Sequence, residues 1–193
     1  MRRGGALLLF RLLGLATVAL VGFGPAAAES YRRPFYVEFR SVDIGVYGHS
    51  YIVHGRLGEG GRTLTAQYAD FHPKGGDLGM VVGHFLPVGG DLTPDRETLS
   101  LPIVARYRQS LNEAEYRNLL AALARVRANP HLWSALANNC NSFVGEMAQA
   151  VGLRAPPSLV LAHEYVSALR TLNESPTKSA GTRPRGSIPT HQL

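Results

Sequence analysis

The chain has 193 residues, of which 45% are hydrophobic, and it carries 20 Lys and Arg, 14 Asp and Glu and a single Cys. This length and apolar content fit one domain with a core and exclude a wholly disordered chain. A single thiol excludes an intramolecular disulfide and the zinc sites that need two or more thiolates. We expect neither a metal ion nor a cofactor.

Most of the excess positive charge lies near the two ends of the chain. Residues 29–172 carry 14 basic and 13 acidic side chains, without a run of Lys and Arg interleaved with aromatic residues. Nucleic-acid binding needs such a basic surface, so this pattern argues against a nucleic-acid partner. The three cations among residues 173–193 predict no more than weak contact with an anionic membrane surface.

The first 28 residues have the pattern of a secretory signal peptide. Three arginines, Arg2, Arg3 and Arg11, precede an uncharged apolar stretch over 12–23, and small residues follow before Glu29. An apolar stretch of about 7–15 residues is typical of a signal and is shorter than the ~20 residues that span a bilayer. We expect cleavage after Ala28 and an exported protein, periplasmic or secreted. An uncleaved anchor over 6–23 is the alternative, in which one central arginine would be costly.

The first half of the remaining chain has the composition of β-strands. Aromatic and β-branched residues predict strands over 34–40, 48–54, 62–68, 80–86 and 99–107. The second and third of these flank the sequence GEGG, which predicts a hairpin. A loop is expected over 72–79 and a turn over 89–95.

Helical periodicity follows in the second half. Ser110 and Glu113 match a capping box at the start of an apolar stripe, which predicts a helix over 112–128. A second helix is expected from Cys140 to Val151, closed by Gly152 in a left-handed conformation. A shorter third helix is expected over 160–172.

These elements predict an α+β fold in which an antiparallel sheet packs against about three helices. The domain is expected over residues 29–172. Residues 173–193 contain almost no apolar side chains and are expected to form a disordered basic tail.

Cys140 is the candidate nucleophile because it lies at the expected start of a helix. Unpaired N–H groups and the helix dipole favour a thiolate there and lower the pKa of the thiol. Asn138 and Asn139 are good capping residues and offer amide donors near a developing oxyanion. The alternative is that Cys140 is a small buried side chain with no chemical role.

A nucleophilic cysteine needs a base, and His49 is the favoured one of the seven histidines. It follows Gly48, which permits a close backbone approach, and it begins an apolar strand that would hold the ring rigidly. A structural role for this histidine is the alternative.

The expected hairpin indicates a third residue for the site, Asp70. If the turn is centred between Glu59 and Gly60, His49 faces Asp70 across the ladder, and facing residues share one face of the sheet. An Asp there could hold the imidazole in the useful tautomer. A register slip of two residues would bring Tyr68 or His72 to that place instead.

The order of these motifs resembles that of the circularly permuted papain-like cysteine hydrolases. This group includes the lecithin retinol acyltransferase-like proteins and relatives of bacterial cell-wall peptidases. The resemblance rests on Gly48 and His49 early in the chain and on Asn139, Cys140 and Phe143 late in it. It implies a permuted papain-like fold over about residues 34–170, with Cys140 as nucleophile and His49 as base. Ser142 departs from the pattern, since several relatives carry His there.

Two functions from different classes follow. The first is an exported cysteine hydrolase, an amidase or peptidase or else an acyl transferase, acting on an amide or ester carbonyl. A peptide or peptidoglycan amide is then the first substrate class and a lipid ester the second. The alternative is a non-catalytic binding module of the cell envelope with a papain-like fold, because fold does not determine function.

Overall fold

The computed structural model describes residues 32–129 and 132–174. Its strands are β1 (Phe35–Val42), β2 (His49–Arg56), β3 (Gln67–Ala69), β4 (His72–Pro73), β5 (Val88–Asp91), β6 (Ile103–Leu111) and β7 (Leu132–Trp133). Its helices are α2 (Gly76–Val82), α3 (Arg96–Ser100), α4 (Glu113–Ala128), α5 (Cys140–Ala150) and α6 (Ala162–Glu174), with a short 3-10 turn at Glu59–Gly61. The predicted signal peptide lies outside the described residues.

The strands form two antiparallel sheets, which confirms the predicted α+β class. The larger sheet has the order β3-β2-β1-β6, and the smaller one has the order β4-β5-β7. In the larger sheet Phe39 of β1 lies opposite Ile52 of β2 and Tyr107 of β6. These three side chains are buried. Nearly every position of β1 and β2 is also buried, so both faces of these two strands are covered.

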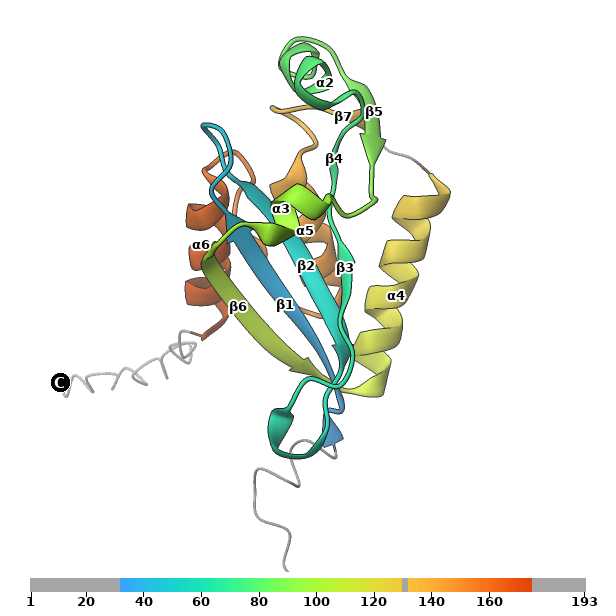
Figure 1. Cartoon of the computed structure of the whole chain (residues 1–193). Coiled ribbons are helices and arrows are strands. Elements are labelled where there is room, and N and C mark those ends of the chain that lie inside the picture. Colours follow the sequence, from blue (N-terminus) through green and yellow to red (C-terminus); the bar gives the residue numbers. More distant parts are fainter. Residues whose placement is uncertain (1–31, 130–131, 175–193) are drawn as a thin grey trace, which may run out of the picture.

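Helices cover one face of the larger sheet, and a loop with one short helix covers the other. Figure 1 shows α5 and α6 behind the sheet and α3 in front of it. The main core joins the sheet to α4, α5 and α6 through residues such as Leu119, Val144 and Val166. A smaller cluster on the opposite face includes Tyr51 and packs against Leu99, near α3.

The three long helices lie close to where the sequence predicts them, but the cap of α4 differs. Its N-cap is Asn112, which accepts a hydrogen bond from Glu115 N in a capping box with the Glu115 side chain. The predicted box of Ser110 and Glu113 is wrong. Strand β6 continues to Leu111, so Ser110 is paired in the sheet and cannot cap a helix.

The end of the folded domain also differs slightly from the prediction. Helix α6 runs to Glu174, and Asn173 on it accepts a hydrogen bond from Arg154 N and donates one to Arg154 O. Residues 173 and 174 therefore belong to the folded part. The rest of the predicted tail lies outside the described residues. Within 32–129 and 132–174, no helix has the length and apolar character needed to cross a membrane.

The middle of the chain holds the largest errors of prediction. The expected loop at 72–79 and strand at 80–86 are replaced by β4 and α2. The predicted strand at 99–107 begins later, at Ile103, because Asp95 caps the short helix α3. The expected turn at 89–95 contains most of β5, which pairs with both β4 and β7.

Candidate active site

His49 is the first residue of β2 and follows the tight turn that joins β1 to β2. Gly48 has a φ of +68°, and its N–H donates to Ile44 O at 3.1 Å. A Cβ at Gly48 would lie 2.9 Å from Val42 O, so the turn requires glycine. The buried imidazole of His49 is therefore attached to a rigid part of the backbone.

Cys140 is the first residue of α5. The Asn139 side chain caps this helix by accepting a hydrogen bond from Ser142 N at 3.1 Å, and the Ser142 hydroxyl accepts one from Asn139 N. Cys140 is a free cysteine, and the residue as a whole is of intermediate burial. Its position at the N-terminus places it beside N–H groups that have no partner within the helix, and these favour a thiolate.

Asn138 and Asn139 support the loop before α5. Asn138 Nδ2 donates to Leu132 O at 3.0 Å, and Asn139 Nδ2 donates to Ala135 O at 2.9 Å. Asn139 is the N-cap of α5, as expected. Both side-chain amides donate to backbone carbonyls, so neither is free to bind an oxyanion at Cys140, contrary to the expectation. The backbone N–H of Cys140 itself is then the candidate donor.

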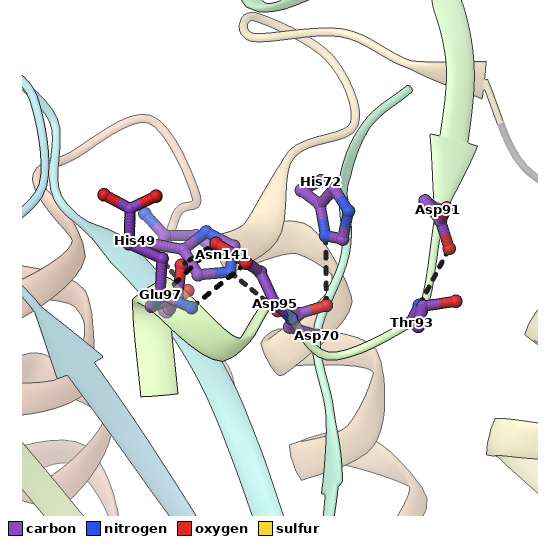
Figure 2. Close-up of polar contacts among 10 residues, drawn as sticks. His49, Asp70, His72, Asp91, Thr93, Asp95, Glu97 and Asn141 are labelled. Carbon is purple, nitrogen blue, oxygen red and sulfur yellow. Dashed lines mark hydrogen bonds and ion pairs between the residues drawn. The ribbon is translucent and has the colours of Figure 1, made fainter. Parts of the chain in front are cut away.

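Asp70 lies just beyond the end of β3, and its side chain is 1% exposed. Its Oδ2 atom lies 3.5 Å from His49 Nε2 and 3.5 Å from Asp95 N, which donates to it. Its other oxygen, Oδ1, lies 3.1 Å from His72 Nδ1. Figure 2 shows both imidazoles directed at this carboxylate. The structure thus brings His49 and Asp70 together.

This contact arises in a register other than the one predicted. The ladder pairs Ile52 with Ala69 and Val53 with Tyr68, a shift of two residues from the expected pairing. Arg56 O accepts from both Leu64 N and Thr65 N, so two residues oppose one and the strand gains a bulge. Asp70 reaches His49 because its side chain spans the gap beyond the last pair of the ladder.

Electrostatics couple Cys140 to His49. Burial alone would lower the pKa of His49, but hydrogen bonds to Asp70 and Cys140, with the charges of both, raise it from 6.5 to about 10. Burial likewise raises the pKa of Cys140, yet His49 and the Ser50 N–H outweigh it and lower that pKa from 9.0 to about 7. At neutral pH the two groups therefore favour a thiolate and an imidazolium.

Asp70 is held ionised by the same partners. Burial would raise its pKa, but hydrogen bonds from His49 and His72 hold that pKa below 3.8. The contact with Asp70 in turn raises the pKa of His72, with a further contribution from Asp91 on the neighbouring strand. His72 was only a register alternative at the level of sequence, whereas in the structure it shares the carboxylate with His49.

Asn141 was missed by the sequence analysis, although it connects three elements behind Cys140. Its Oδ1 accepts from Ser50 Oγ at 2.8 Å, and its Nδ2 donates to Ser158 O at 3.0 Å and Val160 O at 2.9 Å. The side chain is buried. The signal was present, because Asn141 precedes the buried Val144 by three residues and so shares its apolar face of the helix.

Within the described ranges, no group of three or more His, Cys, Asp or Glu side chains is arranged to hold a metal ion. Shallow grooves follow β6 and α6, where Arg106 and Arg170 line them. Cys140, His49 and Asp70 do not line these grooves. A scan against protein-family models and searches of curated proteins and solved structures found no match to this chain.

Proposed function

We propose that this chain is an exported cysteine hydrolase or acyl transferase with Cys140 as nucleophile, His49 as general acid and base, and Asp70 as the residue that orients His49. The observation that carries this proposal is the buried His49 ring, which interacts with both Asp70 and Cys140. The resemblance of the two short motifs to permuted papain-like hydrolases supports it. The N-terminal signal pattern supports a location outside the cytoplasm.

The chemistry follows from the protonation states of the pair. The Cys140 thiolate attacks the carbonyl carbon of an amide or ester, and the Cys140 N–H helps to bind the oxyanion. The carbon–nitrogen or carbon–oxygen bond then breaks, and His49 gives its proton to the leaving amine or alcohol. Water attacks the resulting thioester while His49 removes its proton, and release of the acid restores the Cys140 thiolate and the His49 imidazolium. An alcohol or amine in place of water completes an acyl transfer.

Asp70 has a separate part in this scheme. Because Nε2 of His49 contacts Asp70, the other ring nitrogen, Nδ1, is left to exchange a proton with the thiol. The carboxylate fixes that tautomer and stabilises the imidazolium, as the third member of a catalytic triad does.

The test uses 4-nitrophenyl acetate and the full chain, in which Cys140 is the only thiol. We expect release of 4-nitrophenolate and a mass increase of one acetyl group on Cys140. The Cys140→Ser and His49→Gln variants should lose at least about a hundredfold in rate. His163→Gln, which changes an exposed histidine on α6, is the matched control and should retain the rate.

Two results would overturn the proposal. Full turnover by Cys140→Ser would place the chemistry elsewhere. A wild-type chain that is folded but is never acetylated would favour the alternative, a binding module that has the site geometry without the activity.

A further inference from the structure

Strand β6 forms one edge of the larger sheet, and its outer side is open. In the order β3-β2-β1-β6 it pairs with β1 alone, and Figure 1 shows no strand beyond it. Every second residue of an edge strand directs its N–H and C=O away from the sheet, where another strand can bond them. Within residues 32–129 and 132–174, the backbone of 103–109 has hydrogen-bond partners only on β1.

Two adjoining grooves follow this open edge, between β6 and α6. Arg106 and Arg170 line both of them. Ile103 and Val104, which are 40% and 46% exposed, line one of the two. The edge therefore combines unpaired backbone groups, apolar side chains and positive charge.

The two arginines lie on opposite sides of the edge. Arg106 shares a face of the sheet with Arg108, whose guanidinium lies 4.4 Å from the centre of the Tyr36 ring, in the smaller cluster near α3. Arg170 lies on α6, which covers the other face. Successive side chains of a strand added to this edge would point alternately to these two faces. Acidic residues at adjacent positions of such a strand would meet the two arginines in turn.

The charge of these two arginines is not neutralised by neighbouring side chains. Neither forms an ion pair with another residue that the structure describes. Glu38 is already bound by Arg40 at 2.6 Å and by Arg108 at 2.5 Å. Glu174, at the end of α6, is the other acidic residue that lines the grooves. The edge consequently keeps a net positive charge.

This charge selects among the molecules that could occupy the edge. A second copy of the chain would bring the arginines of two β6 strands together, and like charges that face each other across a ladder are destabilising. The segment 175–193 carries Lys178, Arg183 and Arg185 and no acid, so it would add the same charge. A phosphate group could bind the arginines but would leave the N–H and C=O groups of the edge without partners.

We propose that the open edge of β6 binds an extended acidic segment of a partner protein. The segment adds to the larger sheet as a fifth strand and places carboxylates against Arg106 and Arg170. Hydrogen bonds of the ladder supply general affinity for an extended chain, and the two arginines supply the preference for acidic residues. The edge contains none of the candidate catalytic residues, so this binding requires no activity at Cys140.

The test measures binding of a rhodamine-labelled nonapeptide to the full chain by fluorescence anisotropy. The peptide alternates Thr and Val around two adjacent central glutamates, and a matched peptide has two glutamines there. We expect a Kd at least about tenfold lower for the acidic peptide, since an exposed charge pair contributes up to about fivefold. Arg106→Gln and Arg170→Gln should each raise that Kd by about threefold. Arg117→Gln, which changes an exposed arginine on α4 across the sheet, is the matched control and should leave it unchanged.

A third peptide separates strand addition from attraction of charge alone. It keeps both glutamates but is methylated at every peptide nitrogen, so it can donate no hydrogen bond to the edge. We expect this peptide not to bind. Equal affinity for the methylated and unmethylated acidic peptides would overturn the inference, as would equal affinity for the glutamate and glutamine peptides.

Other occupants of the edge would give different results, each of which would also overturn the inference. Inorganic tripolyphosphate, or vesicles of phosphatidylglycerol, bound more tightly than the acidic peptide and lost in Arg106→Gln and Arg170→Gln would assign the arginines to phosphate groups. A dimer of the wild-type chain that Val104→Lys dissociates, without peptide binding, would assign the edge to a second copy. Peptide binding that requires removal of residues 175–193 would assign it to that segment.

Discussion

Replacing Asp70 by Asn removes the charge beside His49 while nearly preserving the shape of the side chain. The Asp70 Oδ2 atom lies 3.5 Å from His49 Nε2 in a buried place, and an opposite charge at such a distance shifts a pKa by about 1–3 units. The pKa of His49 should therefore fall from about 10 to roughly 7–9. With less imidazolium at neutral pH, the pKa of Cys140 should rise from about 7 toward 9.0.

The consequence for reactivity can be bounded. A thiol with a pKa of about 7 is half ionised at pH 7, whereas one with a pKa of 9.0 is about one hundredth ionised. The thiolate fraction should thus drop by up to about fiftyfold, and we expect a drop of about tenfold.

Nuclear magnetic resonance titration of the ring nitrogens measures the pKa of His49, and ultraviolet absorbance of the thiolate measures that of Cys140. Glu97→Gln is the matched control, because this exposed carboxylate lies on α3 near the site and the variant should leave both pKa values unchanged. A shift of less than about half a unit at His49 in Asp70→Asn would refute the electrostatic coupling that the site geometry implies.

Two further predictions concern stability. Asn141→Ala removes three hydrogen bonds of a buried side chain and should lower the free energy of unfolding in urea by roughly 3 kcal/mol, against less than about 1 kcal/mol for Asn138→Ala. Equal effects would contradict the role of Asn141 in joining the three elements. Burial and then the charge of Arg127 lower the pKa of His54 from 6.5 to about 4, so the unfolded chain binds this proton more readily and stability falls as the pH drops through that range. Between pH 7 and pH 4, the wild-type free energy of unfolding in urea should fall by roughly 3 kcal/mol more than that of His54→Phe, which cannot bind this proton. Parallel pH profiles of the two proteins would contradict this prediction.

The local signals around Cys140 and His49 were strong enough to predict where both residues lie. A Gly before a strand and an Asn before a helix are required by short-range sterics and capping, and these act within a few residues. Gly152 illustrates the same point, since its φ of +82° closes α5 at the predicted residue. Elements of this kind depend little on the rest of the fold.

The contact between Asp70 and His49 was predicted from a strand register that the structure does not have. Sequence composition located the turn near Gly60, but it carried no information about the bulge that shifts the ladder by two residues. The backbones approach closely beside the bulge, where a Cβ on Gly55 would lie 2.1 Å from Thr65 O, and this contact is visible only in the folded chain. The contact survives because a carboxylate beyond the strand end can reach His49 in either register.

The error at 80–86 has a different cause. A short apolar run cannot be assigned to a strand or a helix by periodicity alone. Gly79 allows the helix, because a Cβ there would lie 1.9 Å from Lys74 O, and this close approach is visible only in the folded chain. The apolar side chains of this run are exposed to solvent, although their composition alone would place them in the core.

The central claim is that His49 lowers the pKa of Cys140, and the pH dependence of alkylation by iodoacetamide tests it most directly. The chain has one thiol, so intact mass reports its reaction without interference. The wild-type profile should give an apparent pKa of about 7, and that of a folded His49→Ala variant should move back toward 9.0. A thiol that reacts only after unfolding, or the same apparent pKa in both proteins, would contradict the account.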